Sequence, residues 1–288
     1  MSNLITAAFV RMYTDKVELK FQQKAHEFAG TYRSKQSTAE KDFFEYLGAT
    51  AAYQKTTRHG DTQYVDSQHE RRFGTKKDWA WADLIDKEDR VRMLIEPQSE
   101  YTENAVAAIN REDDEQMVIA FDAAVSTGKD GDGTETYDTT NLQIANGSAG
   151  CTVGKLQTMK LTMDTNEVPK DGRVFAVSPT GVQDLLEDAK ITSSDFNTVR
   201  ALVMGDVNSY MGYRFIQSNR LTDAGSSIRE CWGWHPSCMG KLEGTGITVN
   251  IDRLPTKHYA TQVYVSKCFG YVRLQQNGVI QLDIDESV

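Results

Sequence analysis

The sequence predicts a mixed α+β fold. Three observations predict it: a long helical pattern over residues 97–126, several short segments that alternate like β-strands, and no regular strand–helix–strand repeat. The missing repeat argues against a Rossmann fold or a TIM barrel. With 288 residues, the chain is long enough for one large domain or two modest ones with a sizeable core.

The charge and hydropathy patterns exclude several classes of protein. The formal net charge of −9 argues against broad nucleic-acid binding, which needs a basic surface. No run of about 18 apolar residues is present, so no membrane span is expected. Charges at Arg11, Asp15, Lys16 and Glu18 interrupt the region where a secretory signal would be apolar, which indicates a cytoplasmic chain.

The first segment, residues 5–28, has the pattern of an amphipathic helix. Its large apolar side chains recur every four residues and would form one contact face. These residues are Phe9, Tyr13, Val17 and Phe21.

The next segment, residues 53–83, alternates like a β-hairpin around a turn at Asp66–His69. It contains little that could form a core of its own, so we expect a projecting arm. Trp79 and Trp81 alternate at its end, and we expect them to pack where the hairpin leaves the body.

Residues 97–126 predict one long helix. Pro97 and Ser99 are typical of a helix start, and Gly128 of a helix end. One side carries an apolar stripe of Val106, Ile109, Met117, Phe121 and Ala124. The acidic cluster Glu112, Asp113, Asp114 and Glu115 is expected mostly on the opposite, acidic face of the helix.

The stretch TGKDGDGTETYDTT, residues 127–140, resembles the start of a calcium-binding loop. An EF-hand loop needs Gly at position 6 and Glu at position 12. If Asp130 is position 1, position 6 is Glu135 and position 12 is Asn141. If Gly133 is position 6, position 12 is Thr139. Both alignments therefore lack a required residue. We therefore expect residues 127–150 to form an irregular loop without metal, with a calcium site through Asp130 and Asp132 as the alternative.

The second half of the chain alternates short helices and strands. Leu156, Met159 and Met163 have helical spacing within 152–166. The stretch DGRVFAVSPTGVQDLLED predicts a strand and then a helix, with Ser178 as its cap and Pro179 first. A shorter helix is expected over 194–203, and strands in YMGYRFIQ and GITVNIDRL. Finally, TQVYVSKCFGYVRLQQNGVIQLDID predicts two strands joined in a tight hairpin at Asn277-Gly278.

The sequence contains few residues arranged for catalysis or metal binding. The four cysteines imply no disulfide framework. Cys231, His235 and Cys238 lie close together but are too few for a zinc site. The motifs of serine hydrolases, zinc proteases and dinucleotide-binding proteins are missing. We therefore expect no enzyme, no catalytic residue, no metal and no cofactor, with a metal-binding protein as the alternative.

The order of these elements resembles the major capsid proteins of tailed bacteriophages, the Hong Kong 97-type fold. Residues 47–109, from LGATAAYQKTT to ENAVAAI, look like the extended hairpin (E-loop) and spine helix of this family. PKDGRVFAVSPTGVQDLLED and YMGYRFIQSNRL look like its A domain, and FGYVRLQQNGVIQLDIDES like the closing strands of its P domain. The resemblance implies an N-terminal arm over 1–50, the E-loop over 51–83, the P domain over 84–169 with its spine helix at about 99–126, the A domain over 170–249 and closing P-domain strands over 250–288.

The resemblance also implies a function and partners. The chain would assemble with itself, as pentamers and hexamers, into an icosahedral virion shell around phage double-stranded DNA, without sequence-specific binding and without a membrane. Assembly would take place in the host bacterial cytoplasm, with a portal and cement proteins as further partners. Because Met1 is present, a separate scaffolding protein is expected. A cellular nanocompartment shell protein of the same fold remains the alternative.

The hairpin is the expected contact between subunits. From Tyr53 to Trp79 it carries six basic residues against four acidic ones, so it could dock on the acidic helix face of a neighbour. The alternative is that these charges only keep the hairpin soluble. The expected contact residues are Lys55, Arg58, Tyr64, Arg71, Arg72, Phe73, Lys76 and Lys77.

Overall fold

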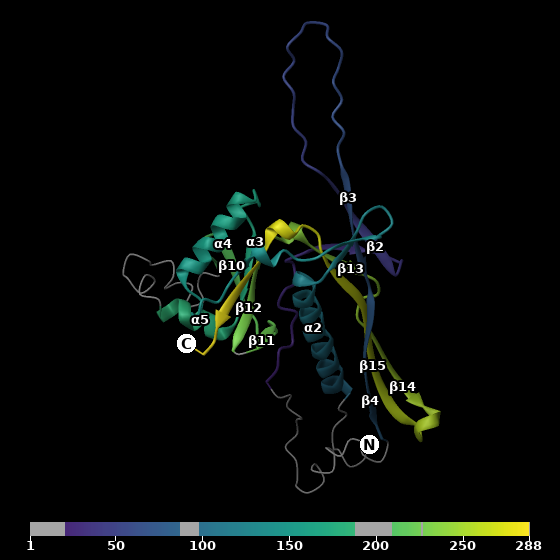
Figure 1. The fold of residues 1–288 in the computed structure, drawn as a ribbon. Coiled ribbons are helices and arrows are strands. Elements are labelled where there is room, and N and C mark those ends of the chain that lie inside the picture. The colour runs from purple at the N-terminus through teal and green to yellow at the C-terminus, as the bar shows by residue number, and fades with distance from the viewer. Residues whose placement is uncertain (1–20, 87–97, 188–208, 226, 288) are drawn as a thin grey trace.

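The computed structural model describes residues 21–86, 98–187, 209–225 and 227–287 (Figure 1). These residues form three β-sheets and one long helix, α2 (Gln98–Asp122), and the predicted mixed fold is confirmed. The five-stranded sheet contains β1 (Arg33–Gln36), β13 (Met239–Glu243), β15 (Ala260–Arg273), β14 (Thr248–Leu254) and β4 (Lys77–Ile85). The seven-stranded sheet contains β7 (Gln143–Ile144), β16 (Val279–Asp285), β12 (Ile228–Trp234), β8 (Arg173–Val177), β10 (Tyr213–Gln217), β9 (Ser209–Tyr210) and β11 (Asp223–Gly225). The four-stranded sheet contains β2 (Lys41–Leu47), β3 (His69–Thr75), β5 (Val125–Thr127) and β6 (Gly133–Glu135).

Helix α2 lies between the two larger sheets (Figure 1). Its 25 residues correspond to about 38 Å at 1.5 Å per residue. Ile109, Met117 and Phe121 are buried, as the apolar stripe predicts. The predicted helix is confirmed, although it ends four residues early, at Asp122, because β5 begins at Val125.

The main core lies between α2, α4 (Val153–Thr165) and the seven-stranded sheet. Phe121 stacks on Trp232 with ring centroids 5.1 Å apart, and both Trp232 and Trp234 are fully buried. On α4 the side chains of Leu156, Met159 and Met163 are buried, which confirms the predicted helix. The predicted strand and helix around Ser178 are also confirmed as β8 and α5 (Pro179–Glu187), and Ser178 Oγ accepts the Gly181 N–H at 3.2 Å.

The predicted hairpin over 53–83 is wrong in its pairing. Strand β3 pairs with β2, from Lys41 opposite Thr75 to Leu47 opposite His69, and residues 48–68 connect them as one long loop. Strand β4 pairs instead with β15 of the five-stranded sheet. The alternation continues across both strands because only Lys76 separates them, so the pattern does not reveal that they belong to different sheets.

The predicted hairpin at Asn277-Gly278 is also wrong. Strands β15 and β16 lie in different sheets, joined by the 3-10 turn η4 (Gln276–Gly278). A Cβ at Gly278 would overlap the Cys238 sulfur, so close packing explains this glycine better than a hairpin turn does. The second 3-10 turn, η2 (Pro236–Cys238), supplies that cysteine, and a third, η3 (Pro255–Lys257), connects β14 to β15.

The segment 127–150 is more regular than expected. It contains the β5–β6 hairpin, the short helix α3 (Thr139–Leu142) and β7. The turn between β5 and β6 uses Gly128 and Gly131, whose φ angles are +94° and +86°. The predicted irregular loop is therefore wrong over much of its length, although Asp130 and Asp132 do lie in the turn.

The N-terminal segment, the domain division and the absence of a membrane span were also predicted from the sequence. Residues 21–28 are not helical, so the predicted helix 5–28 is wrong there; residues 5–20 and the helix expected over 194–203 lie outside the described residues. The sheets cross the expected domain boundaries, since β13 pairs with β15 and β16 pairs with β12, and the domain division stays a prediction. In the described part of the chain, no helix has the length and apolar character needed to cross a membrane.

Candidate functional site

The loop that joins β2 to β3 is the most exposed part of the described chain. Every residue from 49 to 70 is exposed, and Figure 1 shows the loop extending away from the body. Lys55, Arg58 and Tyr64 lie on it, and 91% of the Tyr64 surface is accessible. One contact between its two limbs is the Gln63 N–H, which donates to Tyr53 Oη at 3.2 Å. We call β2, this loop and β3, residues 41–75, the projecting hairpin.

Two arginines at the foot of the projecting hairpin already have partners in their own chain. Arg71 forms an ion pair with Glu45 at 2.7 Å and lies over the Phe43 ring. Arg72 lies 2.6 Å from Glu135 of β6. Their expected contact with another chain stays a prediction, but their charges serve first to fasten the hairpin to its own sheet.

The other expected contact residues near the foot are less free than the sequence indicates. Phe73 is half-buried against Phe43, with ring centroids 5.7 Å apart. Lys76 donates to the Ser37 carbonyl, whereas Lys77 is exposed.

Of the contact residues expected on the N-terminal arm, Phe21 is fully exposed. Phe9, Tyr13 and Val17 lie outside the described residues.

Trp79 and Trp81 lie on β4, beyond the projecting hairpin and on the five-stranded sheet. Both are half-buried, and Trp79 stacks on Phe269 with ring centroids 6.4 Å apart. Trp81 packs against the cluster between α2 and β15, which includes Ile85 and Val263. Their role at the base of the hairpin stays a prediction.

The acidic helix face predicted at Glu112–Glu115 is wrong for its two central residues. Asp113 and Asp114 are fully buried, while Glu112 and Glu115 are half-buried. The sequence spacing already indicated that Asp113 is buried, because it lies four residues from both Ile109 and Met117 and so falls on the apolar stripe. These two carboxylates therefore cannot offer a docking surface.

Asp113 is the centre of a buried ionic cluster. Its Oδ2 lies 2.8 Å from Lys241 Nζ and 2.5 Å from Lys267 Nζ, and Tyr271 donates to Oδ1 at 2.6 Å. Burial alone would raise the pKa of Asp113, but the two ammonium groups hold it below its usual value. Burial in turn lowers the pKa of Lys241, and Asp113 opposes that change.

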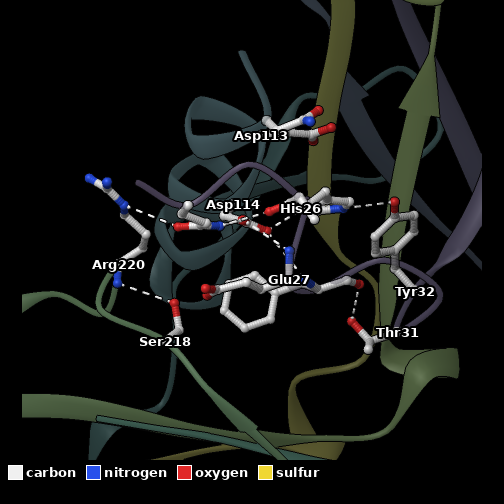
Figure 2. Close-up of polar contacts among 12 residues, drawn as sticks. His26, Glu27, Thr31, Tyr32, Asp113, Asp114, Ser218 and Arg220 are labelled. Atoms are coloured by element: carbon white, nitrogen blue, oxygen red, sulfur yellow. Dashed lines mark hydrogen bonds and ion pairs between the residues drawn. The ribbon is translucent and has the colours of Figure 1, made fainter. Parts of the chain in front are cut away.

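Asp114 fastens the segment before β1 to α2, as Figure 2 shows. It accepts the backbone N–H groups of Glu27 at 3.1 Å and Phe28 at 3.3 Å, and it lies 2.5 Å from His26 Nδ1. The other ring nitrogen of His26 lies 3.0 Å from Tyr32 Oη. Residues 26–32 are thus positioned by the middle of the long helix.

The cysteine cluster and the glycine-rich turn show no grouping for metal. Cys231 and Cys238 are buried in different elements, and burial raises the pKa of Cys231 to about 12, which disfavours a thiolate ligand. His235 is engaged through its ring with Ser237 and the Asp171 carbonyl. Within residues 21–86, 98–187, 209–225 and 227–287, no three His, Cys, Asp or Glu side chains are grouped to hold a metal ion.

Comparisons with known proteins agree on one class. A family model described as phage capsid protein matches residues 5–286. No curated protein sequence matches the chain. Among solved structures, the chain is similar to the capsid of cyanophage P-SCSP1u, with 14% identity, a TM-score of 0.72 and coverage of 96% of this chain and 93% of that one.

Two further structures give the same result. The chain resembles Mycobacterium phage Che8 with 16% identity, a TM-score of 0.71 and coverage of 96% and 97%. It resembles the head structure of Helicobacter pylori bacteriophage KHP40 with 10% identity, a TM-score of 0.73 and coverage of 96% for both chains. The expected phage-capsid fold is confirmed, and these matches do not favour a cellular nanocompartment.

Proposed function

This chain belongs to the phage capsid protein family, and from that premise we propose that it builds a closed icosahedral shell from many copies of itself, as pentamers and hexamers. Its role is structural, without catalysis or a cofactor. The shell encloses double-stranded DNA and is assembled in the host bacterial cytoplasm, with scaffolding, portal and cement proteins as further partners. The net charge of −9 supports this, because a container that releases its DNA should not bind phosphates tightly.

The strongest support for this proposal is the exposure of the projecting hairpin, which has no packing partner for its loop among the described residues. Residues 49–68 of its loop are all exposed, and the loop contributes nothing to the buried clusters. Ordering such a segment costs conformational entropy, about 1–2 kcal/mol for each residue, and contacts with a neighbouring copy would offset that cost. Many weak copies of one contact add together in a shell.

A loop replacement tests the proposal. Residues 50–66 are replaced by a short Gly-Ser turn, which keeps β2, β3 and the hydrogen bond from the Gly48 N–H to the Gln68 carbonyl at 2.8 Å. We expect an unchanged circular dichroism spectrum and a soluble subunit that forms no closed particles in sedimentation velocity and negative-stain images. Closed particles of normal size from this variant would contradict the proposed role of the loop.

A length-matched control separates the loss of the loop from the loss of its side chains. In it, residues 50–66 are replaced by an equally long Gly-Ser segment. It should also fail to close, because it keeps the reach of the loop but not its contacting groups. If the unaltered protein itself forms no particles under any condition, with or without a co-expressed scaffold, the capsid proposal fails.

A further inference from the structure

The pair Asn146-Gly147 lies in a tight turn between β7 and α4. The two central residues of the turn, Gly147 and Ser148, have φ angles of +55° and +53°. The turn is closed by the Ala149 N–H, which donates to the Asn146 carbonyl at 3.1 Å, and these features are those of a type I′ turn. Gly147 and Ser148 are exposed, and a Cβ at Gly147 would meet no atom within 4 Å. The turn is therefore open to solvent.

The groups of this pair that can react with each other are not held by other contacts. Among the described residues, neither the Asn146 side-chain amide nor the Gly147 N–H has a hydrogen-bond partner. One backbone hydrogen bond closes the turn, and a single bond is a weak restraint on local opening. Glycine has no Cβ to shield its nitrogen, so this nitrogen can approach the carbonyl carbon of the asparagine side chain. Asparagine is itself one of the thermolabile residues of proteins.

A second Asn-Gly pair, Asn277-Gly278, lies in the opposite environment. It belongs to the 3-10 turn η4, where the Asn277 carbonyl accepts the Asn166 side-chain amide at 3.1 Å. Gly278 is buried, its carbonyl accepts the His235 N–H at 3.2 Å, and a Cβ there would overlap the Cys238 sulfur. The same two residue types are therefore free to rearrange at one place in the fold and tightly packed at the other.

We propose that Asn146 is a site of spontaneous deamidation, with water as the only co-reactant. The Gly147 nitrogen attacks Asn146 Cγ and gives up its proton, the Cγ–Nδ2 bond breaks, and the amide nitrogen leaves as ammonia with that proton. Water then opens the cyclic imide at one of its two carbonyl carbons. Breaking the bond to Cγ gives an aspartate, and breaking the bond to the main-chain carbonyl carbon gives an isoaspartate, whose main chain runs through Cβ and Cγ.

The two products should affect the fold differently, because the turn is fixed at both ends. Before it, β7 pairs with β16, with Ile144 opposite Leu282. After it, the Ala149 carbonyl accepts the Asp285 N–H at 3.1 Å and Lys155 Nζ at 2.7 Å. An isoaspartate lengthens the main chain between these two anchors by one carbon, whereas an aspartate changes only the charge. We therefore expect the isoaspartate form to be the less stable one.

Peptide mapping tests the assignment of the site. The folded, full-length chain is stored at mildly alkaline pH, and mass spectrometry follows the exchange of an amide nitrogen for oxygen. Trypsin separates the two pairs, because cleavage after Lys129 and after Arg273 puts them on different peptides. Asn146 should be converted at least about tenfold faster than Asn277, because the second pair must first open and 1.4 kcal/mol of opening is a factor of ten. Equal conversion at both positions would overturn the proposal, and so would an unconverted Asn146 when a free peptide QIANGSA is converted.

Two variants connect the modification to its effect. Asn146→Gln keeps an amide but must form a larger ring, so it should resist conversion, and fresh Asn146→Asp should melt like the parent. After storage, the parent chain should accept methyl groups from isoaspartyl methyltransferase and show a second, lower melting transition, and stored Asn146→Gln should show neither. Equal methylation of the parent and Asn146→Gln would assign the product to another position and overturn the proposal. A parent that is not methylated would overturn the isoaspartate product.

Discussion

Asp113 of α2 and Lys241 of β13 form an ion pair with 2.8 Å between Oδ2 and Nζ, and both side chains are almost completely buried. The pair joins the long helix to the five-stranded sheet. Three aromatic rings, of Tyr32, Phe269 and Tyr271, lie within 5.3 Å of the same ammonium group. Such a cluster is costly to break, because removing one partner leaves the other charge buried.

Removing the carboxylate of Asp113 should therefore destabilise the subunit strongly. We expect Asp113→Ala to lower the free energy of unfolding by about 3–5 kcal/mol in urea titrations, because Lys241 loses its counter-charge. Glu112→Ala, at the half-buried neighbouring position, should change it by less than about 0.5 kcal/mol. Replacing the central pair, as Asp113→Leu with Lys241→Met, should regain only part of the loss, because Lys267 keeps its charge and loses Asp113 as its partner. Equal effects at positions 112 and 113 would speak against this account.

Asp114 should control the attachment of residues 22–32. In the Asp114→Ala variant, the Glu27 and Phe28 N–H groups lose a charged acceptor, a loss of about 1.5–3 kcal/mol. Trypsin should then cut after Lys24 about tenfold faster or more, since 1.4 kcal/mol corresponds to a factor of ten in local opening. The control is Glu115→Ala, which breaks only the half-exposed pair with Arg220. Unchanged cleavage would show that other contacts hold this segment.

Glu230 should make the stability depend on pH. It lies opposite Asp283 on the neighbouring strand, and burial, followed by Asp122 and Asp283, raises its pKa from 4.5 to about 7. Between these two pH values the folded state binds more protons than the unfolded state, so stability falls as the pH rises through this window. Glu230→Gln should raise the melting temperature above pH 7 and leave it nearly unchanged below about pH 4.5. The exposed control Glu40→Gln should follow the parent curve, and a uniform shift at all pH values would contradict the assignment.

Gly270 should be essential where the chain passes from β3 to β4. A Cβ at this position would overlap the backbone carbonyl of Thr75, which cannot move without shifting the hairpin. Gly270→Ala should therefore cost about 1–3 kcal/mol by overpacking, measured by chemical unfolding. In Gly246→Ala the added methyl meets no atom within 4 Å, so that variant should be neutral. A neutral Gly270→Ala would mean that the crossing is more adaptable than its packing indicates.

Elements that depend on local sequence were predictable, and those that depend on pairing were not. Helix α4 and the Ser178-capped α5 follow from side-chain spacing and capping, which act within a few residues. The partner of β4 depends on β15, almost two hundred residues away, and alternation contains no information about the partner. The same reason explains why Asn277-Gly278 predicted a hairpin that tertiary packing replaces.

The candidate site was predictable only in part for a similar reason. The long polar connection between β2 and β3 is visible as a segment without a core of its own. That Arg71 and Arg72 find Glu45 and Glu135 within the same chain could not be read from the sequence, because both contacts depend on the three-dimensional course of β2 and β6. The burial of Asp113 was detectable from its place on the apolar stripe, but its lysine partners were not.

The short link between α2 and the projecting hairpin has a mechanical consequence. Helix α2 ends at Asp122 and β5 begins at Val125, and β5 pairs directly with β3 of the hairpin. Only two residues therefore separate the end of the helix from the strand that pairs with β3, so the helix and the paired part of the hairpin, residues 41–47 and 69–75, are closely connected. A force on the hairpin is therefore transmitted through β5 to the C-terminal end of α2. Because the projecting hairpin extends away from the body, a small rotation at β5 displaces the far end of the hairpin by a much larger distance.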